Sequence, residues 1–275
     1  MTVKVFAPAK VNLTLHVTGQ RDDGYHLLDS LVVFADIGDM VSVYRSKEVT
    51  LEVVGPEAAE VPANDSNAVM HAARLMQAEG IALRLEKHLP TAAGVGGGTA
   101  DAAATIRAIA QLCGLDLPDD VLGLGADVPV CMRGRATRMS GVGEVLTDVR
   151  GLPDIWAVLV NPRTPVATPD VFNRLKQKEN PAMPVELPQF QSAQALAGWL
   201  SEQRNDLQTP AIEVQPMIAT VLDVLAQTQG QLLSRMSGSG ATCFALYENG
   251  ESARNAAEAI YHHHPDWWVR DTKLS

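Results

Sequence analysis

The sequence predicts an α+β fold in two lobes. Residues 3–54 alternate between apolar and polar side chains and are rich in β-branched residues, which is typical of strands and hairpins. A glycine-rich loop at residues 94–98 precedes a run of small residues that favours a helix. A second series of strands and helices begins after Arg150-Gly151-Leu152-Pro153, so we expect lobes at residues 1–152 and 153–275.

Each expected element follows from its residue pattern. We expect N-terminal strands at Val3–Leu15 (interrupted at Pro8), at Ser30–Tyr44 (with a turn at Ile37-Gly38-Asp39) and at Val49–Val54. A helix capped by Asp65 or Ser66 carries apolar residues at helical spacing from Ala68 to Met76. The later expected elements are a strand at Ile81–Glu86, a helix at Ala100–Leu112, a strand at Ile155–Val160, a loop at Lys176–Ala193, helices at Ala193–Glu202 and Ile212–Gln227, a hairpin from Gln231–Met236 to Thr242–Tyr247, and a helix at Ala253–Tyr261.

Composition and charge exclude several classes of function. The chain of 275 residues is 46% apolar and 20% charged, an ordinary globular mixture that rules out disorder and fibrous repeats. Its net charge of −10 and its lack of a Lys/Arg run disfavour nucleic-acid binding. We recognise no signal peptide or membrane span and expect a cytoplasmic protein. Cys113, Cys131 and Cys243 are odd in number and far apart, which predicts buried free thiols rather than a zinc site or disulfides.

The most informative local feature is the segment LPTAAGVGGGTADAAATI at residues 89–106. Its glycines let the backbone approach a ligand closely, and the following helix would present unpaired N–H groups and the positive end of its dipole. This combination predicts a phosphate site, with a flexible loop or tight helix–strand packing as the open alternative. The pattern is neither a Walker A loop nor a dinucleotide fingerprint, because no Gly-Lys-Ser/Thr follows and the sixth position from Gly94 is Thr99.

Two pairs of polar residues near the N-terminus are candidates for ligand contact. Lys10 and Asn12 are two positions apart in an expected strand and share one face, where they form either a polar site or a solvated surface. Tyr25 and His26 follow the turn signal Asp23-Gly24. A phenol ring beside an imidazole suits stacking on a heterocycle, and ordinary turn packing is the alternative.

Two further features follow the glycine loop. Asp127, in Gly125-Ala126-Asp127-Val128-Pro129, is a single carboxylate among apolar and small residues. Burying it is costly unless it is paired or functional, and a helix cap is the alternative. Ser237-Gly238-Ser239-Gly240-Ala241 lies between two apolar segments and predicts either a tight hairpin or a second phosphate-facing loop.

Taken in order, the Pro-x-Lys-x-Asn strand, the glycine loop that opens a helix and the late S-G-S-G-A loop resemble the GHMP kinase superfamily, which includes galactokinase, homoserine kinase and mevalonate kinase. The segments that carry the likeness are PAKVNLTLHVTGQRDDGYH, LPTAAGVGGGTADAA, GADVPVCMRG and SGVGE, and the likeness resumes at Thr168–Phe172, Asn205-Asp206 and Met236–Phe244. The resemblance implies a two-lobed fold whose N-terminal lobe is like domain 2 of ribosomal protein S5 and whose C-terminal lobe is ferredoxin-like.

The resemblance also implies an activity and its partners. The activity is ATP-dependent phosphorylation of the 2-hydroxyl of a cytidine diphosphate-linked methylerythritol, in the non-mevalonate route of isoprenoid (terpenoid) biosynthesis. ATP and Mg²⁺ are implied, and we expect a small-molecule substrate, no nucleic-acid or membrane partner, and a monomer or weak homodimer. The lysine and aspartate of catalysis match Lys10 and Asp127.

The remaining site residues are carried over by position. The ATP site matches Pro90, Thr91, Ala92, Ala93, Gly94, Val95, Gly96, Gly97, Gly98, Thr99 and Ala100, with Asn67 on the adenosine side. The substrate site matches Asn12, Tyr25, His26, Phe172 and Asp127, with the rings of Tyr25 and Phe172 around the cytosine. Where a Ser-Ser pair is common, this chain has Thr99-Ala100, so Thr99 keeps a hydroxyl for Mg²⁺ or phosphate and Ala100 loses one.

In the implied chemistry Asp127 accepts the proton of the substrate hydroxyl, and Lys10 keeps Asp127 ionised and stabilises the transferring phosphoryl group. Two alternatives stay open, namely another GHMP-type kinase of homoserine or mevalonate type and a nucleotide-binding regulator without catalysis. Gly24-Tyr25-His26 argues for the cytidyl substrate, and the presence of both Lys10 and Asp127 argues against a regulator. A dehydrogenase is disfavoured because the dinucleotide fingerprint is missing.

Overall fold

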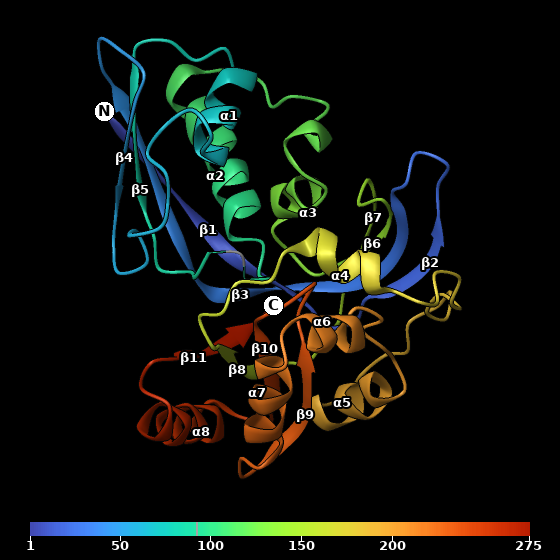
Figure 1. Ribbon diagram of the computed structural model, residues 1–275. Coiled ribbons are helices and arrows are strands. Elements are labelled where there is room, and N and C mark those ends of the chain that lie inside the picture. The colour runs from blue at the N-terminus through green and yellow to red at the C-terminus, as the bar shows by residue number, and fades with distance from the viewer. Residues whose placement is uncertain (92) are drawn as a thin grey trace. The chain divides into compact units, whose positions relative to one another are not determined.

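The computed structural model describes residues 1–91 and 93–275, which form two compact units (Figure 1). The first unit comprises residues 1–10, 37–91 and 96–134, and the second comprises residues 11–36, 93–95 and 135–275. The units are interleaved along the chain, because strands β1 (Thr2–Asn12) and β3 (His26–Arg45) contribute residues to both. The division into lobes at residues 152 and 153 stays a prediction.

The first unit combines a sheet with helices. The end of β3 pairs antiparallel with β5 (Ile81–Glu86), which pairs parallel with β4 (Thr50–Val54), and β1 also pairs with β3. Helix α2 (Gly97–Cys113) packs against α1 (Ala68–Leu75) and α3 (Val128–Arg133), as Figure 1 shows, and the 3-10 helix η1 (Leu122–Leu124) precedes α3. Fully buried alanines at 102–104 allow α2 to approach its neighbours closely.

The second unit is built around an antiparallel sheet in the order β11–β8–β10–β9. Its strands are β8 (Ile155–Asn161), β9 (Gln231–Met236), β10 (Cys243–Tyr247) and β11 (Trp268–Leu274). Helices α7 (Met217–Ala226) and α8 (Gly250–His263) pack against it. The chain order, β8, then helices, β9, β10, α8 and β11, is that of a ferredoxin-like split β-α-β unit.

Shorter elements complete the second unit. β2 (His16–Gln20) and β6 (Thr137–Gly141) each pair antiparallel with the first part of β3, and β7 (Val145–Asp148) pairs with β6. Helices α4 (Thr168–Arg174), α5 (Ala193–Ser201) and α6 (Gln208–Val214) follow β8 in the chain. β11 reaches the same part of β3 through the pairing of Leu274 with Ala35.

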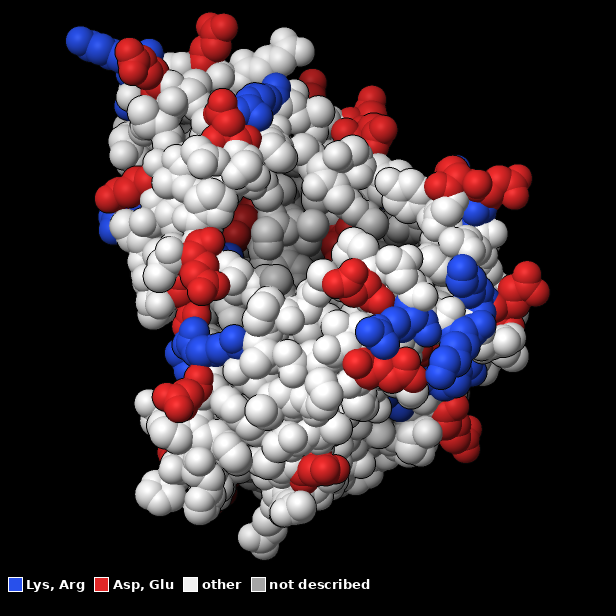
Figure 2. Space-filling model, in the orientation of Figure 1, with Lys and Arg blue, Asp and Glu red and all other residues white. Residues whose placement is uncertain are grey.

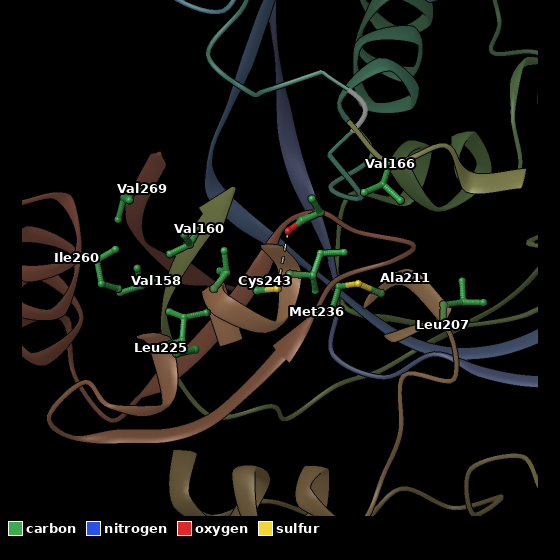
Figure 3. Packing of buried hydrophobic residues seen from close by; sticks show 14 of the residues in the cluster. Val158, Val160, Val166, Leu207, Ala211, Leu225, Met236, Cys243, Ile260 and Val269 are labelled. Atoms are coloured by element: carbon green, nitrogen blue, oxygen red, sulfur yellow. Dashed lines mark hydrogen bonds between the residues drawn. The ribbon is translucent and has the colours of Figure 1, made fainter. Parts of the chain in front are cut away.

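The core of the second unit lies between this sheet and its helices. Val158 and Val160, two positions apart on β8, point to one face of the sheet and are fully buried. Figure 3 shows them close to Leu225 of α7 and Ile260 of α8, with Cys243 of β10 in the same cluster. The buried faces of the strands and the apolar faces of the helices therefore pack together in one core.

Two expectations for the N-terminal strands are wrong. β3 runs without a turn through Ile37-Gly38-Asp39, and Gly38 instead marks a close approach to β1, because a Cβ there would overlap the carbonyl oxygen of Ala7. β1 continues through Pro8. Among the described strands β1 pairs with β3 alone, and a strand with one unpaired side tolerates a proline because that N–H is not required for pairing.

Several helix boundaries also differ from expectation. The N-cap of α1 is Asn67 rather than Asp65 or Ser66, and α2 begins at Gly97 rather than Ala100. The expected helix Ile212–Gln227 is divided into α6 and α7, since Pro216 cannot continue a helix. α8 is longer than expected because Asn249 caps it at Gly250. We did not expect β2, β6, β7, β11, η1, α3 and α4 from the sequence, and the other expected elements are confirmed.

The surface and the cysteines agree with the composition. In the face drawn in Figure 2, several basic side chains gather at the right of the view with acidic side chains beside them, and elsewhere the two signs are interspersed. Within residues 1–91 and 93–275, none of the helices has both the length and the apolar character needed to cross a bilayer. The three cysteines are free thiols; Cys131 and Cys243 are buried as expected, and Cys113 is half-buried.

Candidate active site

Lys10 and Asp127 form an ion pair in the first unit. The Lys10 Nζ atom lies 2.9 Å from Asp127 Oδ2, with 4% of the lysine side chain and 29% of the aspartate side chain exposed. Asp127 stands at the N-cap position of α3 but makes no capping hydrogen bond. Its carboxylate is therefore directed to the lysine rather than to the helix, which excludes the helix cap as the role of this side chain.

The N-terminus of α2 lies beside this pair. Gly96 has a φ of 65°, and a Cβ at this position would lie 3.2 Å from Lys10 Cε and 3.2 Å from Thr99 Oγ1. Only glycine combines this backbone conformation with such close packing. The Thr99 hydroxyl donates to the carbonyl oxygen of Gly96 at 2.8 Å and accepts from the Cys131 thiol at 3.8 Å, so its oxygen keeps one lone pair for a further contact.

The first turn of α2 has the properties of an anion site. Its N-cap, Gly96, has no side chain to cap the first N–H groups, and α2 is 17 residues long. Uncapped N–H groups and the helix dipole attract negative charge, and the Lys10 ammonium adds a positive charge nearby. A phosphate could therefore be held here with an ammonium and a carboxylate within reach.

Residues 93–95, at the tip of the glycine loop, are held in the second unit by the loop that joins β9 and β10. The Ser237 hydroxyl donates to the carbonyl oxygen of Gly94 at 3.0 Å, and the Thr242 N–H donates to the carbonyl oxygen of Ala93 at 3.1 Å. Gly94 has a φ of 70°, and a Cβ there would lie 2.5 Å from the Ser237 carbonyl oxygen. The segment Ser237–Ala241 is thus a hairpin connection that also supports the glycine loop.

Asn12, at the end of β1, is buried in a polar network of the second unit. Its side-chain NH₂ donates to the Ser30 hydroxyl at 2.8 Å, and its backbone N–H donates to the Ser237 hydroxyl at 3.1 Å. The Ser30 hydroxyl in turn donates to the carbonyl oxygen of Thr14. This network fixes the amide of Asn12 and connects it with the support of Gly94.

Tyr25, His26 and Phe172 lie in the second unit. The rings of His26 and Phe172 are stacked, with centroids 4.6 Å apart and planes at 24°, while Tyr25 is 63% exposed. Burial lowers the pKa of His26, and the positive charge of Lys178 adds to the shift, so the imidazole is neutral near pH 7. Among the described residues the buried Nε2 atom of His26 has no hydrogen-bond partner, which leaves it available to a ligand.

Asn67 has a structural role in the first unit. Its side-chain oxygen accepts from the Val69 N–H at 2.8 Å, and its NH₂ donates to the carbonyl oxygen of Pro62 at 2.7 Å. The oxygen therefore caps α1 and the NH₂ binds the chain before the helix, so any contact with adenosine would use the remaining N–H or lone pair.

The structure distributes the candidate residues over both units. The first unit contains Lys10, Asn67, Pro90, Thr91, Gly96, Gly97, Gly98, Thr99, Ala100 and Asp127, and it brings Lys10, Gly96, Thr99 and Asp127 together. The second unit contains Asn12, Tyr25, His26, Ala93, Gly94, Val95 and Phe172, and it brings His26 to Phe172 and Asn12 near Gly94 through Ser237. Ala92 lies outside the described residues.

Sequence reasoning missed several residues that support these groups. Ser30 lies within an apolar strand pattern, and Asp39 was assigned to a turn. Lys87, at the end of β5, resembles an ordinary solvated lysine in sequence, yet it is buried between two carboxylates. Their partners are distant along the chain, so no local spacing would have identified them.

The geometry fits a class of enzyme that binds phosphate groups and moves a proton from a hydroxyl. Comparison with family models gives two matches, GHMP kinases N terminal domain at residues 67–140 and GHMP kinases C terminal at residues 186–266. The chain belongs to the GHMP kinases, and it is an ATP-dependent small-molecule kinase. The expected fold with an S5-like and a ferredoxin-like lobe agrees with this family.

Full-length relatives narrow the comparison to one kind of kinase. A protein of Dinoroseobacter shibae named 4-diphosphocytidyl-2-C-methyl-D-erythritol kinase is 58% identical over 98% of this chain and 94% of its own length. A protein of Cereibacter sphaeroides with the same name is 55% identical over 98% of this chain and 99% of its own. A crystal structure of 4-(cytidine 5'-diphospho)-2C-methyl-D-erythritol kinase is 33% identical, with a TM-score of 0.79 and 99% of both chains covered.

Proposed function

We propose that this kinase transfers the γ-phosphoryl group of ATP to the 2-hydroxyl of 4-diphosphocytidyl-2-C-methyl-D-erythritol, a step of non-mevalonate isoprenoid biosynthesis. The observation that carries the proposal is the Lys10–Asp127 ion pair beside the uncapped N-terminus of α2. The full-length relatives with this name support the choice of substrate. They also disfavour the alternative of a homoserine or mevalonate kinase.

Asp127 is the proposed general base. Phosphoryl transfer depends on positioning and charge neutralisation more than on covalent chemistry, and the base removes the proton of the attacking hydroxyl. The Lys10 ammonium lies 2.9 Å from this carboxylate and forms an ion pair with it. It also offers a positive charge to the transferring phosphoryl group.

The first turn of α2 and the glycine loop are proposed to hold the ATP phosphates. This assignment covers Pro90–Ala100, and it uses the backbone N–H groups rather than side-chain charge. Asn67 is proposed on the adenosine side. Thr99 retains acceptor capacity beside Lys10, so the Thr99-Ala100 pair is expected to serve in place of two serines.

Mg²⁺ is proposed to enter as the complex with ATP. Within residues 1–91 and 93–275 there is no group of three or more His, Cys, Asp and Glu side chains that could hold a metal by themselves. The residues present fit a cation carried mainly by the phosphates, with the Thr99 hydroxyl oxygen and the Asp127 carboxylate as the nearby protein oxygens. When bound, the metal neutralises phosphate charge.

The cytidyl group is proposed to bind at Tyr25, His26 and Phe172. The exposed Tyr25 ring offers a stacking surface, and the buried His26 Nε2, which has no partner within the described part of the chain, offers a hydrogen bond. The Phe172 ring already lies on the imidazole and fixes its plane. Asn12, held by Ser30, is proposed as a polar contact near the diphosphate or the accepting hydroxyl.

A substrate panel tests the proposed function. ADP release would be measured with Mg²⁺, ATP and, separately, the cytidyl substrate, homoserine, mevalonate and galactose. We expect ADP release above background with the cytidyl substrate alone. Turnover with homoserine or mevalonate but not with the cytidyl substrate would replace this proposal with the alternative, and nucleotide binding without turnover on any substrate would indicate a regulator.

We further propose that the protein is cytoplasmic and acts as a monomer or weak homodimer. The substrates are ATP and a charged nucleotide-linked alcohol, and both are expected in the cytoplasm. Sedimentation over a range of protein concentrations would measure the oligomeric state, and cell fractionation would test the location. A stable higher oligomer, or recovery in the membrane fraction, would contradict this proposal.

A further inference from the structure

A buried cluster of three charged side chains lies in the first unit, apart from the Lys10–Asp127 pair. The Lys87 ammonium pairs with the carboxylates of Asp39, on β3, and Asp101, on α2, the second at 2.9 Å. The exposed fractions of the lysine, Asp39 and Asp101 side chains are 4%, 0% and 4%. The cluster therefore joins a strand, the segment after β5 and a helix in the interior of the unit.

The cluster holds the backbone that enters the glycine loop. Asp39 Oδ1 accepts from the His88 N–H at 2.6 Å and from the Leu89 N–H at 2.9 Å. These are the last two residues before Pro90, where the proposed phosphate loop begins. One carboxylate thus fixes both the Lys87 side chain and the chain direction into the loop.

The same cluster holds the chain that leaves the loop. Asp101 is the fifth residue of α2, just after the proposed phosphate-binding segment. A Cβ on Gly97, in the first turn, would lie 3.5 Å from Lys87 Nζ and 3.9 Å from Asp39 Oδ2. The first turn of α2 therefore rests on the cluster, and the entrance and exit of the loop are tied to a single ammonium group.

The energetics of such a cluster favour a functional role over a stabilising one. Two carboxylates share one ammonium in the interior, and buried ion pairs are often no more stabilising than apolar side chains of similar size. Asp101 Oδ1 is buried and has no hydrogen-bond partner among the described residues. Burial opposes the charge on Lys87, but its two carboxylate partners raise the pKa of Lys87 above its usual value.

We propose that Asp39, Lys87 and Asp101 are positioning residues that set the separation of the two ends of the phosphate loop, so that the N–H groups of the first turn of α2 are pre-arranged for the ATP phosphates. The inference rests on the proposed function, because it assigns nucleotide binding to this loop. None of the three side chains needs to touch ATP. They contribute by keeping the loop ordered before nucleotide binds, so that the loop loses less conformational entropy on binding.

Asp101→Ala is the main test. It detaches α2 from Lys87 but leaves a balanced Lys87–Asp39 pair, so the protein is expected to fold. We expect the dissociation constant of ADP, measured by calorimetry, and KM for ATP to rise about tenfold or more, because a loosened loop must be ordered on binding. KM for the cytidyl substrate is expected to stay within about twofold of wild type. Asp101→Asn keeps an acceptor oxygen for Lys87 and is expected to restore most of the ADP affinity.

Asp29→Ala is the matched control. Asp29 is also a buried carboxylate, paired at 2.7 Å with Arg138, but it belongs to the second unit. It is expected to lower the melting temperature and to leave the ADP affinity within about twofold. The proposal is overturned if Asp101→Ala binds ADP like wild type, if it raises both KM values equally, or if Asp29→Ala weakens ADP binding as much.

Hydrogen exchange on the unaltered protein gives a second test that does not depend on how a variant folds. The amides of His88 and Leu89 are expected to be protected before any nucleotide is added, since Asp39 already binds them. Exchange of these two amides at unprotected rates without ADP would overturn the proposal. ADP binding is measured without the cytidyl substrate, so a protein that binds ADP but phosphorylates nothing would refute the proposed function and leave this inference standing.

Discussion

At the scale of single residues, the account rests on the charges of Lys10 and Asp127. The Lys10 ammonium lies 2.9 Å from the Asp127 carboxylate, and a carboxylate is a group that can accept a proton from a hydroxyl. The sequence shows that both residues are present but does not show that they lie close together. They are separated by more than a hundred positions, and only the folding of β1 against the segment before α3 brings them together.

Asp127→Asn tests the assignment of the base. The amide keeps the shape of the side chain but cannot accept the proton, so kcat is expected to fall by about 10²–10⁴-fold. The dissociation constant of ADP should stay within a few-fold of wild type, because the phosphates are held by backbone N–H groups. Steady-state kinetics and calorimetry provide both values. Asp119→Asn, at an exposed carboxylate, is the control, and near wild-type turnover by Asp127→Asn would remove Asp127 as the base.

Tyr25→Ala and Phe172→Ala test the site for the cytidyl group. Tyr25→Ala removes a ring on which the base would stack, and Phe172→Ala removes the ring that holds the His26 imidazole in place. Stacking of a base on a ring contributes about 1–3 kcal/mol. We expect KM for the cytidyl substrate to rise about tenfold in each variant, while KM for ATP changes little. Tyr261→Ala, at an exposed tyrosine of α8, is the control. An equal increase in both KM values would contradict a specific stacking role.

At the scale of the elements, local pattern predicted most strands and helices but not the contacts between strands. Gly38 illustrates the difference. In sequence, Ile37-Gly38-Asp39 resembles a turn, yet the glycine is needed because β1 approaches β3 too closely for a side chain. The division between α6 and α7 could have been predicted from Pro216, and β11 could have been predicted from the turn signal Pro265-Asp266 that precedes it.

Gly38→Ala tests this reading of β3. The added methyl group would overlap the backbone of Ala7 and Pro8, and the strands must move apart. Overpacking of this kind lowers the free energy of unfolding by about 1–3 kcal/mol. Urea denaturation would measure the change. Gly198→Ala, in α5 with no atom within 4 Å of the added Cβ, should instead stabilise the protein slightly. A Gly38→Ala protein as stable as wild type would contradict the close approach of β1 to β3.

The buried carboxylate of α2 makes stability depend on pH. Burial raises the pKa of Asp101 to about 7, and Asp39 adds to the shift while Lys87 opposes it. Because the folded protein holds this proton more tightly than the unfolded chain, the contribution to stability is complete below about pH 4 and is lost as the pH rises through about 7. Asp101→Asn cannot titrate, so its free energy of unfolding should fall less than that of wild type between about pH 5 and pH 8.

Urea denaturation of both proteins at several pH values would measure this difference. Burial also lowers the pKa of His16 and of His26, but both histidines are present in both proteins, and their contribution cancels in the comparison. Parallel pH profiles for wild type and Asp101→Asn would contradict the shifted pKa of Asp101.

At the scale of the whole molecule, the α+β class and the order of most elements could be predicted because they depend on local periodicity. The family could be recognised because its motifs are short and contiguous, as in the glycine loop. Long-range partners could not be predicted in this way. Three such contacts join residues from distant elements. They are the hydrogen bonds of Ser30 with Asn12 and of Ser237 with Gly94, and the pairing of Lys87 with two carboxylates.

The identity of the product is the most direct measurement of the central claim. Purified protein would be incubated with Mg²⁺, ATP and 4-diphosphocytidyl-2-C-methyl-D-erythritol, and the products followed by phosphorus NMR. The account predicts one new phosphomonoester, located on the 2-hydroxyl, for each ADP formed, and its loss in Asp127→Asn over the same time. Phosphate on another hydroxyl, or ADP formed without a phosphorylated alcohol, would contradict it.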